Sequence, residues 1–222
     1  AVCAGVAVLS CTGEGPVSPR LRSRTASLLV ASDPSSPRIS EIHYDNTGTD
    51  AGEAIEVSGP AGMDLTGWQL VLYNGNGGAS YNTTTFSGTI PATCGTRGVV
   101  VVNYPVSGIQ NGDPDGVALV NASGTVVEFL SYEGTFAAVG GPANGLTSTD
   151  IAVREAGTEA IGLSLQRKAD GTWNGPVAST FGACNDNDGT PPPVVASITV
   201  LPATATVNQG ATLQFTAKAF DA

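Results

Sequence analysis

The sequence predicts an all-β fold, an antiparallel β-sandwich, and three observations lead to this prediction. Short segments from residue 38 onward alternate apolar and polar residues with the period of two that a half-buried strand requires. Turn-forming residues bound these segments, and the chain of 222 residues contains 29 Gly and 14 Pro. No segment has the periodicity of an amphipathic helix. Two packed antiparallel sheets account for this pattern.

The expected strands follow one another along the chain. In order they read RISEIHY, EAIEVSG, GWQLVLYNG, SYNTTTFSGTI, RGVVVVN, DGVALVN, TVVEFLSYEG, DIAVRE and LSLQRK. In the second segment Ile55 and Val57 alternate with Glu56, as they would on a strand with one buried face. RGVVVVN has apolar residues at both odd and even positions, which is the pattern of a central strand covered on both faces.

The glycines of WQLVLYNGNGG, residues 68–78, are expected to turn a hairpin. A phosphate loop needs G-x-x-x-x-G-K-[ST] or G-x-G-x-x-G, followed by a helix whose amides hold the anion. No Lys follows here, and the next residues, ASYNTTTF, favour strand. Asn74–Gly75 and Asn76–Gly77 instead supply the positive φ of a tight turn.

The chain is acidic, with 9 basic and 19 acidic residues and a net charge of −10. Between residues 39 and 185 there are 14 acids, against Arg97, Arg154, Arg167 and Lys168. A surface of this sign repels nucleic acid phosphates, so direct nucleic-acid binding is not expected. Cations or neutral polymers, including a protein or polysaccharide ligand, are the expected partners.

The first 37 residues are expected to lie outside the sandwich. Residues 1–11, AVCAGVAVLSC, are far shorter than the ~20 apolar residues of a membrane span, and they are typical of the end of a secretion signal. VLSC is similar to a bacterial lipoprotein box, although Leu9 stands where a smaller residue is usual. Cys11 is therefore a candidate for lipidation. Residues 12–37 have the composition of a linker.

A second change of composition follows the sandwich. Residues 186–194 are acidic and contain three consecutive prolines, which favour a stiff extended spacer. Residues 195–222 then alternate again, at Ile198 and Val200 and at Leu213 and Phe215. We expect two strands there, the beginning of a second β domain that is truncated in this sequence.

The four cysteines include no C-x-x-C pair of the kind that binds zinc or carries redox chemistry. Cys94 and Cys184 both fall inside the expected sandwich. In an oxidising compartment they could form a disulfide that closes a loop of about 90 residues. Two free buried thiols are the alternative.

Catalytic machinery is not expected in this chain. Its one histidine, His43, lies on an expected strand beside Asp45, and no G-x-S-x-G nucleophile motif is present. A metal site for hydrolysis would need further ligands around this histidine. We therefore interpret His43 as a half-buried strand residue.

Carboxylates are the most abundant functional groups, and they gather at two expected turns. The turn DNTGTDAGEAIE contains Asp45, Asp50, Glu53 and Glu56, and the turn NGDPDG contains Asp113 and Asp115. Calcium takes six to eight oxygen ligands, so either turn could contribute to a Ca²⁺ site. Neither turn matches an EF-hand loop, and local hydrogen bonding also places Asp and Asn in turns.

Several aromatic residues could lie on the surface of the sandwich and stack on sugar rings. They are Tyr44, Tyr73, Tyr81, Tyr104, Tyr132 and Trp173. Sheets also bury aromatic residues in their cores, and Trp68, followed by Leu70 and Leu72, has that pattern. The core position is the favoured interpretation for the group.

A combination of these segments resembles the lamin-tail domain found in secreted bacterial proteins. The similar stretches are ISEIHYDNTGTDAGEAIEVSGPAGMDLTGWQLVLYNGNGG, GIQNGDPDGVALVNASGTVVEFLSYEG and GLSLQRK, and the resemblance covers residues 38–185. It implies an immunoglobulin-like sandwich with no catalytic residues, of the kind attached to extracellular nucleases. Residues 195–222 resemble the first strands of a bacterial immunoglobulin-like repeat.

These observations predict a non-catalytic module that binds or positions, in a larger protein that is secreted or tethered to the cell surface. It would be accessory to a fused catalytic domain, such as a hydrolase. Two alternatives remain: the N-terminal part of an extracellular nuclease, or a purely structural surface stalk. A membrane would be contacted only through a lipid on Cys11.

Overall fold

The computed structural model describes residues 4–10, 35–185, 195–201 and 212–221, and all regular secondary structure in them is β. These residues belong to two units, one within Val30–Thr190 and the other within Ala1–Leu29 and Pro191–Ala222. In the described part of the chain no helix has the length and apolar character needed to cross a membrane. The predicted all-β class is confirmed.

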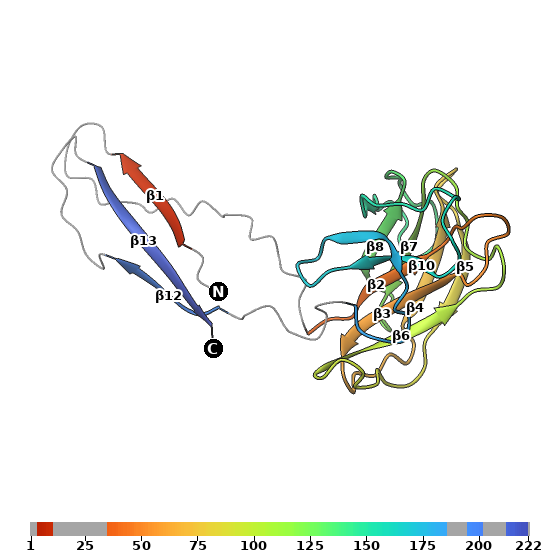
Figure 1. The fold of residues 1–222 in the computed structure, drawn as a ribbon, viewed down its shortest axis with the longest axis horizontal. Helices are drawn as coiled ribbons and strands as arrows, with labels where there is room; N and C mark the ends of the chain where they lie inside the picture. The colour runs from red at the N-terminus through yellow and green to blue at the C-terminus, as the bar shows by residue number, and fades with distance from the viewer. Residues whose placement is uncertain (1–3, 11–34, 186–194, 202–211, 222) are drawn as a thin grey trace. The chain divides into compact units, whose positions relative to one another are not determined.

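The larger unit is built from two five-stranded sheets (Figure 1). One sheet has the strand order β11-β10-β2-β3-β6 and the other β5-β4-β7-β8-β9. The bounds are β2 (Arg38–His43), β3 (Ala54–Pro60), β4 (Gln69–Asn74), β5 (Ser80–Thr85), β6 (Arg97–Asn103), β7 (Asp115–Val120), β8 (Val126–Tyr132), β9 (Thr149–Asp150), β10 (Leu163–Arg167) and β11 (Trp173–Ala178). Neighbouring strands are antiparallel except β8 and β9, which are parallel.

The main core takes side chains from both sheets, which therefore pack as a sandwich. Its buried members include Ile39, Ile42, Ile55, Val57, Leu70, Leu72, Val117, Leu119, Leu130 and Leu165. Two tyrosines at strand ends join the sheets: the rings of Tyr44 and Tyr132 stack with centroids 3.8 Å apart. In β3 and β4 the predicted period-two alternation places the core members on the inner faces: Ile55 and Val57 in β3, Leu70 and Leu72 in β4.

A second, smaller core covers the outer face of the β5-β4-β7-β8-β9 sheet. Its members are Val71, Tyr73, Ala118, Val120, Phe129, Phe136, Ala138 and Ala143. The last three belong to residues 133–148, the connection between β8 and β9. This connection hides the outer face of the sheet, so β4 and β7 are buried on both sides.

The glycine-rich segment after β4 turns the chain into β5, as the sequence predicts. Asn74 N–H donates to the Ala79 carbonyl (2.9 Å), and Gly77 and Gly78 have φ of 95° and 74°. Gly75 has ordinary φ, in contrast to the prediction. Position 75 has no room for a side chain, because a Cβ there would overlap the Pro114 carbonyl.

The central position predicted for the strand RGVVVVN is wrong. This strand, β6, lies at the edge of its sheet and pairs only with β3. Its inner residues, Val100 and Val102, pack against the main core. On the other side Val99 is only 3% exposed, and its N–H donates to the Thr93 hydroxyl (3.1 Å). The segment before β6 therefore covers a strand that has no second neighbour.

Two other elements differ from the prediction. DIAVRE contributes only Asp150 to the two-residue β9, and the chain leaves the sheet at Ala152, which has a φ of 62°. β11 was not expected, because Gly175 and Pro176 interrupt its sequence pattern. Proline is tolerated at a sheet edge, where its missing N–H breaks no ladder bond, and β11 is an edge strand.

The smaller unit contains one three-stranded sheet with the order β1-β13-β12. The two strands expected after residue 194 are present as β12 (Val195–Leu201) and β13 (Thr212–Asp221). Residues assigned to the leader form β1 (Ala4–Ser10), which pairs antiparallel with β13. Cys11 lies outside the described residues, as does nearly all of the predicted linker at 12–37, so its lipidation stays a prediction.

Candidate functional site

A hollow of about 370 Å³ brings together the two acidic turns that the sequence singled out separately. Its walls come from the β2–β3 loop, the β4–β5 turn and the segment between β6 and β7. The lining residues are Asp50, Asn74, Asn76, Ser107, Ile109, Gln110, Asn111, Gly112, Asp113, Pro114 and Asp115. Most of these side chains are amides or carboxylates, so the hollow presents negative charge together with amides that both donate and accept hydrogen bonds.

Two of the predicted ligand carboxylates shape the hollow from within the protein. Both oxygens of Glu53 accept backbone N–H groups, from Gly108 (2.8 Å) and Ile109 (2.9 Å). Asp115 likewise accepts from Gly75 (2.8 Å) and Gly112 (2.6 Å). Burial raises the pKa of both acids, while these N–H bonds oppose the rise. Their oxygens are engaged in holding loops, which leaves little capacity for a ligand.

The other predicted carboxylates are more accessible. Asp113 is exposed on the rim, and Asp50 accepts a weak bond from the Asn111 amide (3.3 Å). Asp45 lies beside Asp50, and partial burial, followed by that neighbouring acid, raises the pKa of Asp45. Glu133 lies near Asp113, and its pKa is raised by burial and then by the charge of Asp113. This end of the sandwich is therefore strongly negative.

The acids do not assemble into a metal centre by their own geometry. Among the residues that the structure describes, no group of three or more His, Cys, Asp or Glu side chains is placed to hold a metal ion. The calcium hypothesis therefore depends on Asp50 and Asp113, together with neutral oxygens of the hollow. The hypothesis is untested, and the engaged oxygens of Glu53 and Asp115 weigh against it.

His43 is more deeply buried than the sequence predicts and is paired with an acid that sequence reasoning missed. Its Nδ1 lies 2.8 Å from Oε1 of Glu155, and the two residues are 2% and 0% exposed. Oε2 of Glu155 accepts the N–H groups of Tyr44 (2.7 Å) and Asp45 (2.9 Å). Glu155 thus fastens the start of the β2–β3 loop, one wall of the hollow, to the connection between β9 and β10.

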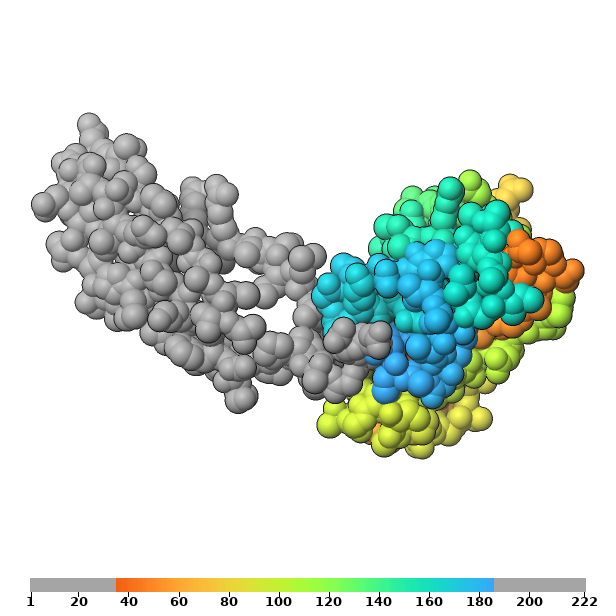
Figure 2. Space-filling model, viewed as in Figure 1, coloured from red at the N-terminus to blue at the C-terminus, as the bar shows by residue number. Residues whose placement is uncertain are grey.

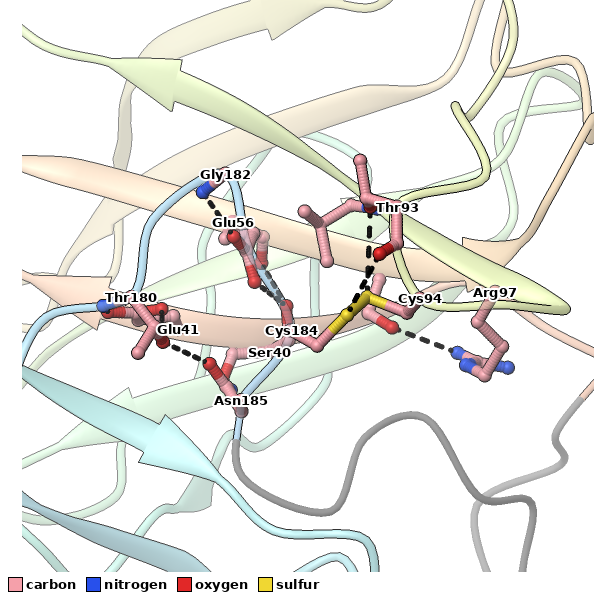
Figure 3. Close-up of a disulfide and its surroundings, with 12 residues drawn as sticks. Ser40, Glu41, Glu56, Thr93, Cys94, Arg97, Thr180, Gly182, Cys184 and Asn185 are labelled. Carbon is pink, nitrogen blue, oxygen red and sulfur yellow. Dashed lines mark hydrogen bonds between the residues drawn. A yellow bond between two sulfur atoms is a disulfide. The ribbon is translucent and has the colours of Figure 1, made fainter.

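The outer face of β2 and β3 carries two more buried acids, Glu41 and Glu56, both fully buried (Figure 3). Glu41 accepts hydrogen bonds from the backbone N–H of Thr180 (2.7 Å) and from the Thr180 hydroxyl (2.8 Å). It also accepts one from the Ser164 hydroxyl (2.6 Å). Glu56 accepts from Gly182 N–H (2.9 Å). Charge-assisted bonds of this kind are stronger than neutral ones. The two acids fix residues 179–185, here called the C-terminal tail, against the sheet.

A disulfide between Cys94 and Cys184 closes the C-terminal tail onto the segment before β6. The two Cα atoms are 5.6 Å apart, and 90 residues separate the cysteines in sequence. Figure 2 shows the blue end of the sandwich lying against the yellow-green residues that precede β6. The next residue, Asn185, donates to the Ser40 carbonyl (2.8 Å). The tail is therefore held by covalent and polar contacts along its length.

Three of the six aromatic residues considered for sugar stacking are buried, and tyrosine hydroxyls organise loops. Tyr44, Tyr73 and Tyr132 are each at most 2% exposed. The Tyr132 hydroxyl donates to the Gln110 carbonyl, and Gln110 N–H donates to the Tyr81 hydroxyl (2.9 Å). These bonds position a residue that lines the hollow. Tyr81, Tyr104 and Trp173 are half-buried and pack against the main core.

Comparisons of the chain with protein-family models, with curated proteins and with solved structures find no match. The lamin-tail resemblance therefore remains an expectation based on its sequence motifs. We therefore base the proposed function on the contacts around the hollow and around the C-terminal tail.

Proposed function

We propose that the sandwich is a non-catalytic binding and positioning module, of the lamin-tail kind, in a protein that is secreted or tethered to the cell surface. The observation that carries this proposal is the acidic hollow, which three separate loops build at one end of a rigid scaffold. Loops held by a rigid framework are a common location for recognition. Fixed acceptors and negative charge suit a cationic or hydroxyl-rich ligand.

The engagement of the reactive side chains supports a binding role over a catalytic one. Both ring nitrogens of His43 have partners, Glu155 and the Ala51 carbonyl. A general base needs a nitrogen that can reach a substrate proton. Glu41 and Glu56 are enclosed beneath the C-terminal tail and have hydrogen-bond donors there. A disulfide in the same unit suits an oxidising compartment, in keeping with secretion.

A structural stalk is the second candidate function, because the smaller unit is also all-β. In that arrangement the sandwich would act as a spacer, and the hollow would have no ligand. The nuclease alternative makes a different prediction: the chain itself would cleave DNA. We expect plasmid DNA with magnesium or calcium to remain intact, and cleavage that disappears in His43→Ala would overturn the non-catalytic proposal.

A labelled oligolysine peptide tests the hollow as a recognition surface. Fluorescence anisotropy should detect binding to the 222-residue chain that weakens as salt is added, because exposed charges are screened. Asp50→Asn and Asp113→Asn together should weaken binding. Asp64→Asn with Asp170→Asn is the matched control, since it removes the same charge from exposed positions away from the lining. Equal weakening in both double variants, or no binding, would favour the stalk.

A further inference from the structure

A groove of about 300 Å³ lies between the two sheets, on the side where β9 and the β10–β11 turn contribute its walls. This volume is at the lower end of the range for small-molecule sites, about 300–1,000 Å³. The lining residues are Leu130, Thr149, Asp150, Ile151, Ala152, Val153, Arg167, Gly171, Thr172 and Trp173. None of them lines the acidic hollow, so the groove is a separate site.

Arg167 is held rigidly in this groove. Its Nη1 donates to Oε1 of Glu128 (2.6 Å) and to the Ile39 carbonyl (3.4 Å), and its Nε donates to the Gly171 carbonyl (3.3 Å). The other oxygen of Glu128 accepts Ile39 N–H (2.8 Å). Nη2 makes no hydrogen bond to the part of the chain that the structure describes. A guanidinium fixed in this way presents a pre-organised donor, and little side-chain entropy remains to be lost on binding.

Asp150 supplies the complementary acceptor. Its Oδ1 accepts Ala152 N–H (2.9 Å), which fixes the carboxylate, while Oδ2 has no hydrogen-bond partner among the described residues. Trp173 is the cross-strand partner of Arg167, packs against the main core and lines the groove. A fixed donor, a fixed acceptor and a large aromatic surface therefore converge on one apolar floor, formed by Leu130 and Ile151.

The charges of the groove select the class of ligand. Glu128 neutralises Arg167, and Asp150 adds a negative charge, so phosphates and carboxylates are disfavoured. An uncharged sugar ring has an apolar face that stacks on an aromatic residue, and hydroxyls that both donate and accept. We infer that this groove binds one ring of a neutral polysaccharide, stacked on Trp173 and hydrogen-bonded to Arg167 and Asp150.

Intrinsic fluorescence gives a direct test, because the chain has two tryptophans and Trp68 is only 8% exposed. The complete 222-residue chain is titrated with neutral hexasaccharides of glucose, mannose and xylose, and with a hexamer of galacturonic acid. We expect a saturable change in emission with at least one neutral oligosaccharide and none with the acidic one. No saturable change with any neutral oligosaccharide, or an equal response to the acidic hexamer, would overturn the inference.

Variants then locate the site, with binding measured by calorimetry and folding checked by the melting temperature. Trp173→Leu keeps apolar packing but removes the ring, and Asp150→Asn keeps Oδ1 as the acceptor for Ala152. Each should weaken binding about tenfold, the effect of losing roughly 1.4 kcal/mol. Ile161→Ala, at an exposed position outside the groove, should bind normally.

The outcome also separates this site from the hollow. If Asp113→Asn weakens sugar binding and Trp173→Leu does not, the sugar binds at the hollow. That result would overturn the groove as a site while leaving the proposed binding function intact. If the oligolysine peptide fails to bind but the groove variants weaken sugar binding, the groove is a recognition site without the hollow.

Discussion

The imidazole of His43 and the carboxylate of Glu155 lie 2.8 Å apart, although 112 residues separate them in sequence. Burial alone would lower the pKa of His43, but the hydrogen bond and the charge of Glu155 outweigh it, and the pKa is raised. The pair joins β2 to the segment between β9 and β10. The folded structure therefore favours the protonated form of His43.

This pair predicts a stability that falls as pH rises. Because the folded state binds the proton more tightly, the contribution of His43 is fully present below its unfolded pKa, about 6.5. It is lost as pH rises through the higher folded value. Urea unfolding from pH 5 to 9 should show a slope of at most about 1.4 kcal/mol per pH unit in this window, and His43→Gln should flatten it.

Buried acids are an internal control for this experiment. The pKa values of Glu53 and Asp115 are also raised, so they too favour folding at low pH. They are present in both proteins, so the difference between the two curves reports the pair of Glu155 and His43, the chain's one histidine. Parallel curves for the wild type and His43→Gln would contradict the assignment.

The disulfide predicts a large response to reduction. A cross-link between residues 90 apart, such as Cys94 and Cys184, adds about 4.6 kcal/mol in the chain-entropy model. Reductant should lower the free energy of unfolding of the wild type by an amount of this order. The double variant Cys94→Ser, Cys184→Ser should be less stable from the start and insensitive to reductant. A wild type that reductant leaves unchanged would contradict a bridged pair.

Glu41 predicts a local effect on the C-terminal tail. Glu41→Ala leaves the Thr180 N–H and the Ser164 hydroxyl without their acceptor, at a cost of about 1–3 kcal/mol for each group. Hydrogen exchange should accelerate in residues 179–185 more than in β4. Asp113→Ala, at an exposed position, is the control and should leave the tail protected. Unchanged exchange in Glu41→Ala would mean that the disulfide alone holds the tail.

Calcium at millimolar concentration is expected to leave the melting temperature unchanged. The ion takes six to eight oxygens, and the oxygens of Glu53 and Asp115 already accept backbone N–H bonds. A ligand at 100 times its dissociation constant would add about 2.7 kcal/mol, which a thermal scan detects readily. A rise that Asp50→Asn with Asp113→Asn abolishes would show that the hollow does bind calcium.

The alternation of side chains made the sheets predictable, because a strand with one buried face has a period of two. Ile55 and Val57 point into the core as expected, with Glu56 on the opposite face. The same reasoning failed for Glu56 itself, which alternation places toward solvent. The C-terminal tail, more than 120 residues later, covers it through the bond from Gly182. Burial by so distant a segment leaves no mark in the local pattern.

The hollow was predictable only in part. Asp50 and Asp113 were singled out as turn residues, and the structure brings them to one hollow. That Glu53 holds a loop while Asp113 stays exposed depends on which N–H groups lie nearby. Glu155 shares this difficulty: it falls within an expected strand, and its partner His43 comes from the other end of the unit.

The position of the disulfide also determines how the sandwich responds to mechanical tension. Cys184 stands one residue before Asn185, where the described part of the sandwich ends, and it is bonded to the segment that enters β6. A pulling force that arrives through the chain beyond Asn185 passes into Cys94 and then into the β3–β6 ladder. The bonds of Thr180 and Gly182 to the buried acids precede Cys184 in the chain, so the disulfide shields them from this force.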